Sequence, residues 1–286
     1  MTFSERLAAG VIQTNTPLCV GIDPWADRLP GRRSLPALAP NAALADLARA
    51  FGLAVVDASV GQVASVKPQF AFFEAMGVPG MQALADVCGY ARERGLVVIG
   101  DAKRGDIGST AAAYAASSLG GGAPFPCDAL TVSPFLGPES VRTFLDAAIP
   151  ARCGIFVLVR TSNPGSSAWQ TPVYDDLTAW IATNAAALRD TNDLSPLGLV
   201  VGATKGAEIA NVRERCPNSW LLVPGFGAQG GSAADARQAL RSDGLGALIV
   251  SARAATFPSV PDEDYDRNPT NWIRRRIAAT IIELRQ

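Results

Sequence analysis

Short apolar runs alternate along the chain with longer segments in which Ala, Leu and Arg recur at helical spacing. The runs are continuous rather than alternating, which is typical of strands buried on both faces of a parallel sheet. Eight runs occur, at 18–22, 63–66, 96–99, 129–132, 154–159, 197–201, 220–223 and 247–250. The predicted helices include 4–13, 79–94, 109–119, 138–148, 174–189, 232–240 and 272–284.

Eight strand–helix units in succession predict an α/β protein with a (β/α)8 TIM barrel, and a doubly wound sheet is the alternative. A chain of 286 residues fits such a barrel as one domain, 1–286. The long, proline-rich crossover 24–61 is expected to add a helix and a loop over the barrel mouth. The acidic segment 258–271 is expected to be a solvated loop, with Thr270 or Asn271 capping the last helix.

Composition excludes several functions. The formal net charge is −1 and no Lys/Arg-rich run occurs, so nucleic acid and acidic membranes are not expected partners. No apolar stretch approaches the ~20 residues that span a bilayer, and the N-terminus lacks a signal pattern. The five cysteines form no Cys-x-x-Cys pair, which indicates buried free thiols in a reducing cytoplasm rather than zinc ligands or disulfides. They are Cys19, Cys88, Cys127, Cys153 and Cys216.

The chain contains no histidine, so acid–base chemistry has to use lysine, carboxylates, tyrosine or cysteine. Asp101 and Lys103 follow the run 96–99 two residues apart and therefore point the same way, and Asp106 follows soon after. Lys67 ends the preceding run. On neighbouring parallel strands these four side chains would form an array of alternating charge at the barrel mouth, where catalytic groups lie. The alternative is a solvated turn with a weak surface ion pair.

The loop after the seventh run begins with Pro224 and contains Gly225, Gly227 and Gly230 at dinucleotide-fingerprint spacing. No acidic residue ends the next strand, where a ribose ligand belongs, so a nicotinamide-dependent oxidoreductase is disfavoured. A phosphate cradle fits better, because the loops after strands seven and eight of barrels often bind phosphate. Arg253 at the end of the eighth run would add a bidentate contact, unless it forms only a surface ion pair.

Taken together, these segments closely resemble orotidine 5′-monophosphate decarboxylase, in particular its longer bacterial subgroup. The matching motifs span residues 18–253 in order, and the third-strand motif combined with the Pro-Gly…Gln-Gly-Gly loop is highly specific. The motifs are LCVGID at 18–23, SVKPQFAFFE at 65–74, DAKRGDIGST at 101–110, TVSPFLG at 131–137, TSNPG at 161–165, VVGAT at 200–204 and VPGFGAQGG at 223–231.

The resemblance implies cofactor-independent decarboxylation of orotidine 5′-phosphate to UMP by a cytoplasmic homodimer, with no metal. Lys103 would protonate C6, and Lys67 would hold Asp101 and also contact the ribose. Asp106 and Thr110 would reach the other subunit's site. The remaining implied contacts are Asp23 and Thr110 to ribose, Ser162 to the pyrimidine, Gln229 to base and phosphate, and Pro224, Gly225, Ala252 and Arg253 around the phosphate. Many relatives have Gly where this chain has Ala252, whose methyl group would crowd the phosphate slightly.

Two rivals remain. Keto-gulonate phosphate decarboxylases and hexulose phosphate synthases resemble the chain in the Asp-x-Lys-x-x-Asp motif but bind magnesium through a strand-two Glu. Lys67 occupies that strand end here and would repel a cation. A catalytically silent nucleotide-phosphate-binding protein is the other rival, and the intact charged residues argue against it.

Overall fold

The computed structural model describes residues 1–36, 39–203, 206–227 and 231–286. Its eight parallel strands pair in chain order, and β8 pairs with β1 to close the barrel. This confirms the TIM barrel and excludes the doubly wound sheet. The strands are β1 (Leu18–Ile22), β2 (Ser65–Pro68), β3 (Val97–Arg104), β4 (Ala129–Val132), β5 (Gly154–Arg160), β6 (Ser195–Val201), β7 (Ser219–Pro224) and β8 (Ala247–Ser251).

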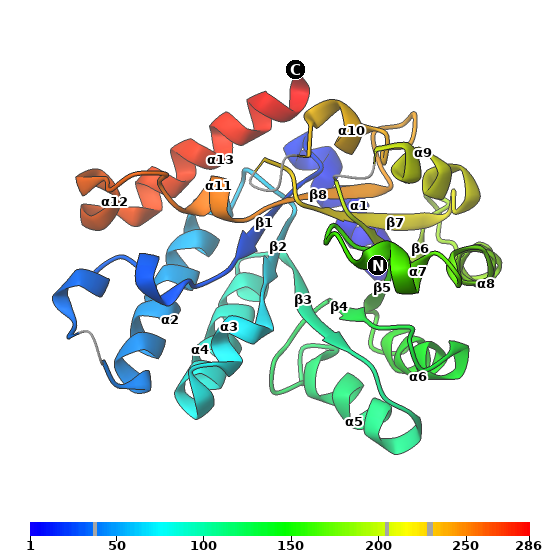
Figure 1. Ribbon diagram of the computed structural model, residues 1–286, viewed down its shortest axis with the longest axis horizontal. Coiled ribbons are helices and arrows are strands. Elements are labelled where there is room, and N and C mark those ends of the chain that lie inside the picture. Colours follow the sequence, from blue (N-terminus) through cyan, green and yellow to red (C-terminus); the bar gives the residue numbers. More distant parts are fainter. Residues whose placement is uncertain (37–38, 204–205, 228–230) are drawn as a thin grey trace.

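The helices surround the barrel, as Figure 1 shows. The α-helices are α1 (Phe3–Thr14), α2 (Asn41–Ser59), α3 (Phe70–Glu74), α4 (Gly77–Glu93), α5 (Gly108–Ser118), α6 (Pro138–Ala148), α7 (Ser166–Gln170), α8 (Tyr174–Ala187), α9 (Gly206–Arg215), α10 (Ala233–Arg237), α11 (Arg253–Thr256), α12 (Glu263–Arg267) and α13 (Pro269–Arg285). Among its described residues, the crossover 24–61 contains a single α-helix, α2, and two 3-10 turns, η1 (Ala26–Arg28) and η2 (Arg32–Ser34). The additional length expected to form an extra helix is therefore taken up by the two short turns and the chain around them.

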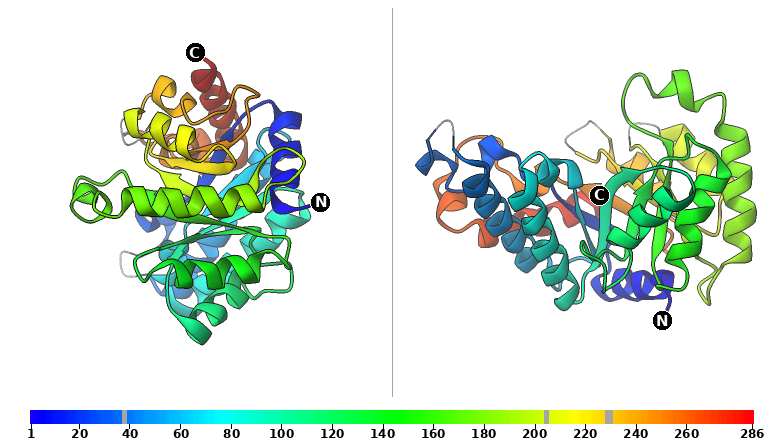
Figure 2. Two further views of the ribbon diagram at one scale, coloured as in Figure 1. Left: turned by 90° about the vertical axis from the view of Figure 1, so that its right-hand side faces the viewer. Right: turned by 90° about the horizontal axis from the view of Figure 1, so that it is seen from below.

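Apolar side chains fill the barrel and the layer outside it. Phe3 and Leu7 of α1 pack with inward-facing strand residues such as Phe156 and Trp220, so α1 closes the amino-terminal end of the barrel. In the right-hand view of Figure 2 this helix lies below the strands. The opposite end is left for the polar residues that follow the strands, which is where a TIM barrel carries its site.

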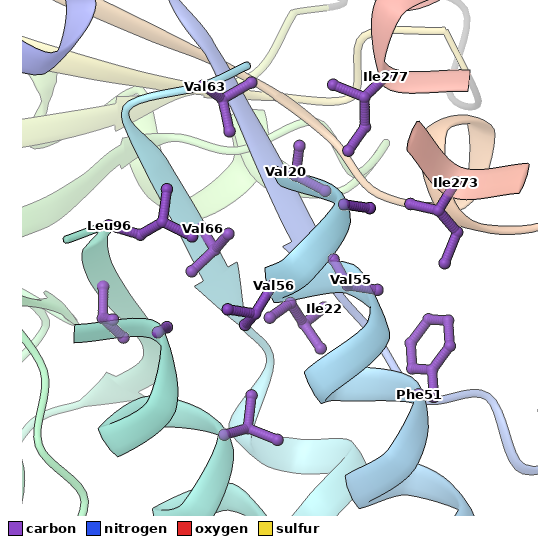
Figure 3. Close-up of a cluster of buried hydrophobic side chains, with 14 of the residues drawn as sticks. Val20, Ile22, Phe51, Val55, Val56, Val63, Val66, Leu96, Ile273 and Ile277 are labelled. Atoms are coloured by element: carbon purple, nitrogen blue, oxygen red, sulfur yellow. The ribbon is translucent and has the colours of Figure 1, made fainter. Parts of the chain in front are cut away.

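The outer layer over β1 and β2 is built by α2, α4 and α13. Figure 3 shows Val20 and Ile22 of β1 facing Val55 of α2 and Ile273 of α13. At the α2–α4 contact a Cβ on Gly52 would lie 2.5 Å from a methyl carbon of Val87, so only glycine permits this close approach. Helix α2 of the long crossover therefore forms part of the core.

The segment 258–271 differs from the expected solvated loop. It forms the short helix α12, whose Tyr265 is buried against Phe257 and Trp272. Asp262 caps α12 and also accepts a 2.7 Å hydrogen bond from Trp272 Nε1. The cap of α13 is Asn268, not Thr270 or Asn271, because Pro269 occupies the first helical position and the Asn268 side chain accepts from Asn271 N.

Candidate active site

A cavity of about 480 Å³ opens at the carboxyl ends of the barrel strands. We call it the mouth cavity. Its lining comes from strands on all sides of the barrel, so it is a property of the closed sheet rather than of one motif. The predicted residues that line it are Asp23, Lys67, Asp101, Lys103, Ser162, Pro224, Gly225, Ala252 and Arg253.

Asp101 is the centre of the charged cluster in this cavity. One carboxylate oxygen, Oδ2, accepts hydrogen bonds from Lys67 Nζ at 2.6 Å and from Gln69 Nε2 at 2.8 Å. The other, Oδ1, accepts from Lys103 Nζ at 2.6 Å and from Thr131 Oγ1 at 3.1 Å. Four donors from three neighbouring strand ends therefore fix the position of a single carboxylate.

The two lysines differ in exposure. The Lys67 side chain is 6% exposed and lies beneath Asp101, whereas the Lys103 side chain is 48% exposed and faces the cavity. A buried ammonium needs a carboxylate partner, and Asp101 supplies it. Lys67 is therefore placed to hold Asp101, and Lys103 is the lysine that a bound molecule can reach.

The charges in the cluster shift one another's ionisation. Burial disfavours the charged form of Asp101, but Lys67 and Lys103 outweigh it and hold the pKa of Asp101 well below its usual range. Burial likewise disfavours the Lys67 ammonium, yet Asp101 and Asp23 keep the pKa of Lys67 above its usual value. At neutral pH Asp101 is thus an anion between two cations.

The backbone at Lys103 is strained. Its φ of 48° lies in the left-handed region, which costs a residue with a long side chain about 1–2 kcal/mol. β3 also runs beyond the apolar run that predicted it and includes Asp101 and Lys103, which were expected at the end of the strand. Such strain is found where function requires a particular side-chain direction. It turns the Lys103 side chain toward the same carboxylate as Lys67.

Asp23 and Arg253 lie on the side of the cavity formed by β1 and β8. Asp23 Oδ1 is buried and has no hydrogen-bond partner among the described residues, and burial raises the pKa of this carboxyl, partly offset by Lys67. The Arg253 guanidinium lies 5.5 Å from the centre of the Trp25 ring and has no carboxylate at ion-pair distance in the described part of the chain. Both groups are therefore available to a polar ligand.

Ala252 packs against β1. A Cβ on Gly21 would lie 2.5 Å from the Ala252 Cβ, so the methyl group rests against the bare backbone of Gly21. The extra carbon at this position is thus accommodated by a glycine on the neighbouring strand.

Two of the predicted residues, Asp106 and Thr110, are not joined to the cluster within one chain, and a third, Gln229, lies outside the described residues. Asp106 lies outside the mouth cavity, and its Oδ1 accepts from the Ile107 backbone N–H at 2.8 Å. Thr110 is exposed on α5. The four-residue array expected from the sequence is therefore a three-residue cluster in the isolated chain.

The sequence analysis did not predict the two neutral hydrogen-bond donors to Asp101, which are Gln69 and Thr131. Gln69 lies two residues after Lys67, and this spacing was a signal that it shares the Lys67 face. Thr131 lies in an apolar run and carried no such signal. Gln170 was missed too; its side chain bonds the Thr161 backbone N–H at 2.9 Å and the Thr161 hydroxyl at 2.8 Å, at the edge of the cavity.

Comparison with known proteins agrees with this geometry. The family model described as "Orotidine 5'-phosphate decarboxylase / HUMPS family" matches residues 16–265. The chain belongs to this family. An orotidine 5'-phosphate decarboxylase of Rhodopirellula baltica is 40% identical over 294 residues, covering 98% of this chain and 97% of the relative. One of Deinococcus radiodurans is 42% identical over 261 residues, covering 90% of this chain and 89% of the relative.

A solved structure of the family has the same fold. The OMP decarboxylase of Leishmania donovani superposes with a TM-score of 0.76 at 31% identity, covering all of this chain and 98% of the other. Among the described residues, no group of three or more Cys, Asp or Glu side chains gathers to hold a metal ion, and no helix is long and apolar enough to cross a bilayer.

Proposed function

We propose that this protein decarboxylates orotidine 5′-phosphate to UMP and carbon dioxide, the last step of de novo UMP biosynthesis, without a cofactor. Family membership supports the reaction. The observation that carries it is the Asp101 carboxylate held between a buried lysine and a lysine that faces the cavity. The sequence expectation and the family agree on the same reaction.

The chemistry requires a cation where negative charge develops. When the bond between C6 and the carboxylate breaks, its electron pair stays on C6 and carbon dioxide leaves. The Lys103 ammonium stabilises this carbanion and then donates a proton to C6, leaving a neutral amine that water reprotonates. Lys103 is thus the proposed proton donor.

Asp101 is proposed to lie beside the leaving carboxylate. Two like charges destabilise the bound substrate more than the state in which carbon dioxide has formed. At 4 Å two unit charges interact by ~1 kcal/mol in water and ~4 kcal/mol at an effective dielectric constant of 20. An enzyme lowers its barrier by ~8–23 kcal/mol, so charge alone is insufficient and binding energy from the rest of the substrate has to contribute.

The other cavity residues are proposed to bind the ribose phosphate and the base. The unpartnered Asp23 oxygen can accept a ribose hydroxyl, and the unpaired Arg253 can bind phosphate next to the Ala252 backbone N–H. Ser162 lies at the β5 end of the cavity, in reach of a pyrimidine edge. Pro224 and Gly225 form the start of the phosphate loop, and Gln229 is proposed to bridge base and phosphate.

Purified protein in EDTA is expected to consume orotidine 5′-monophosphate. The reason is that Lys67 occupies the strand-two position from which magnesium-dependent relatives bind their metal, and its ammonium repels a cation. The measurement is the loss of the substrate's ultraviolet absorbance over time. Activity that appears only with added magnesium, or only on sugar phosphates, would contradict this function. Binding of UMP without any turnover would instead indicate a silent phosphate-binding protein.

We propose that the protein acts as a homodimer in which Asp106 and Thr110 enter the partner's site. Both residues lie outside the mouth cavity of their own chain, beside an exposed apolar surface. This surface comprises Ile107, Phe135 and Leu136 in the neighbouring loops after β3 and β4, and Phe135 is 79% exposed. An exposed apolar surface of this kind marks a protein contact, and a two-fold axis is the commonest way to bury it.

Mixing Lys103→Ala and Asp106→Asn chains is expected to restore activity that neither variant has alone. In each mixed dimer, one site combines an intact Lys103 with the partner subunit's intact Asp106. Random pairing then yields about a quarter of wild-type activity, since half the dimers are mixed and each has one intact site. The measurement is turnover after the two variants are co-refolded at equal concentration.

The matched control is a mixture of Lys103→Ala and Asp101→Asn chains. These residues act in the same chain, so no mixed dimer has an intact site and no activity should return. If the first mixture also stays inactive while both variants dimerise, Asp106 does not act across the interface.

We further propose that residues 1–286 act as one TIM-barrel decarboxylase domain in the cytoplasm. The family match spans most of the barrel. All five cysteines are free and buried, which suits a reducing compartment.

A further inference from the structure

The ladder between β3 and β4 contains an irregularity at the active site. Gly100 pairs with Leu130, but the next pair joins Arg104 to Val132. Three residues of β3, including Asp101 and Lys103, therefore lie opposite the single residue Thr131. A bulge of this kind removes ladder hydrogen bonds and redirects side chains.

The Thr131 hydroxyl takes the place of the missing ladder contacts. It accepts a hydrogen bond from the Lys103 backbone N–H at 2.9 Å and donates one to Asp101 Oδ1 at 3.1 Å. A hydroxyl has one hydrogen and two lone pairs, so it can do both at once. Thr131 is 1% exposed and β-branched, which leaves its side chain little rotational freedom.

These contacts close a ring through both charged residues. From Thr131 the ring runs to Asp101 Oδ1, from there to Lys103 Nζ at 2.6 Å, and back through the Lys103 backbone N–H. The same residue, Lys103, has the left-handed φ of 48°. One hydroxyl thus contacts the strained backbone of Lys103 and the carboxylate that orients its ammonium.

We propose that Thr131 is a positioning residue for the decarboxylation. Its hydroxyl holds the bulge of β3 in the one conformation that directs the Lys103 ammonium at the reacting carbon. The inference rests on the proposed function for its kinetic consequence, and on the structure alone for the position of Lys103. A methyl group in place of the hydroxyl would leave the part-buried Lys103 N–H without its acceptor.

The test compares Thr131→Val, which keeps the shape of threonine without its hydroxyl, with Thr131→Ser, which keeps the hydroxyl. Thr131→Val is expected to lower kcat about 10- to 100-fold with a much smaller change in KM, because misplacement of a reacting group affects the chemical step. Thr131→Ser should stay within about threefold of wild type. Thr143→Val, on the exposed face of α6, is the matched control and should change nothing.

Acetylation of Lys103 by acetic anhydride, quantified by peptide mass spectrometry, gives a readout that needs no turnover. Lys67, Lys103 and Lys205 are the only lysines in the chain, so the modified peptides are easily assigned. In the Thr131→Val variant, acetic anhydride should acetylate Lys103 several-fold faster than in the wild type at the same pH. The reason is that the Lys103 amino group spends less time paired with Asp101. Thr131→Ser should match wild type.

The outcomes separate the two proposals. If folded Thr131→Val shows an unchanged acetylation rate of Lys103 and an unchanged kcat, the positioning role is overturned. A Thr131→Ser variant whose kcat falls as far as that of Thr131→Val overturns it too. If the wild type fails to decarboxylate its substrate while acetylation responds as expected, the proposed function fails and the positioning of Lys103 by Thr131 stands. Circular dichroism and thermal unfolding establish that each variant is folded.

Discussion

Replacing Lys103 with alanine is expected to lower kcat on orotidine 5′-monophosphate by about 10⁴-fold or more. The substitution removes both the cation beside the developing carbanion and the proton that C6 receives. The Lys103 side chain is 48% exposed and Asp101 retains Lys67 as its buried ion-pair partner, so the loss of activity should not come from unfolding. Asp101 keeps its bonds to Lys67, Gln69 and Thr131.

The measurement is kcat for wild type and variant, with UMP affinity and thermal unfolding as controls. Affinity for the product and the unfolding temperature should change little, since phosphate and ribose contacts come from other strands. Ethylammonium ions, small enough for the vacated space, should restore part of the activity. A Lys103→Ala enzyme with more than about a tenth of wild-type kcat would assign the proton transfer to another group.

Replacing Asp101 with asparagine is expected to destabilise the fold as well as abolish turnover. The amide cannot neutralise Lys67, whose side chain is only 6% exposed, and removing one partner of a buried ion pair costs about 3–5 kcal/mol. Asp146 of α6 is the matched control, because its ion pair with Arg142 is more than half exposed and should contribute under ~1 kcal/mol. Urea denaturation of Asp101→Asn and Asp146→Asn at pH 7 measures both effects.

The destabilisation is expected to depend on pH in a defined direction. Burial opposes ionisation of Asp101, but Lys67 and Lys103 hold its folded-state pKa below the unfolded value of about 3.9. The carboxylate therefore contributes its full stabilisation above about pH 4 and loses it as the pH falls through the depressed pKa. The difference in unfolding free energy between wild type and Asp101→Asn should narrow below pH 4 and be constant between pH 5 and 7. A difference that stays the same down to pH 2 would show that the charge of Asp101 does not stabilise the fold.

The fold could be predicted largely from the sequence because most strands coincide with a local run of apolar residues. β1 and β4 begin and end where the apolar runs do, since a strand buried on both faces has to be apolar throughout. β3 could not be delimited in this way. Its last four residues, Asp101 to Arg104, are mostly charged, and contacts with distant segments hold them in the strand. Asp101 bridges to Gln69, the Lys103 backbone N–H donates to the Thr131 hydroxyl, and Arg104 pairs with Val132 of β4.

In the candidate site, too, some features could be predicted from the sequence and others could not. The two-residue spacing of Asp101 and Lys103 predicted that they share one face, because side chains alternate within a strand. The polar residues that follow the apolar runs were predicted to lie at the strand ends. Spacing could not show that Asp106 lies outside the cavity of its own chain, since a loop obeys no such period. Nor could it identify Tyr265 as a core residue, because its neighbours are acidic and its contacts with Phe257 and Trp272 depend on how the chain turns before and after α12.

The sequence by itself therefore determined the barrel, the family resemblance and the charged residues at its mouth, all of which depend on local pattern. Only the tertiary structure decided the division of labour within the cluster, with Lys67 buried, Lys103 facing the cavity, and Gln69 and Thr131 completing the bonds to Asp101. The physical reason is that burial and hydrogen bonding between strands are set by the closure of the sheet. Closure brings β2, β3 and β4 side by side at a register that no single segment specifies.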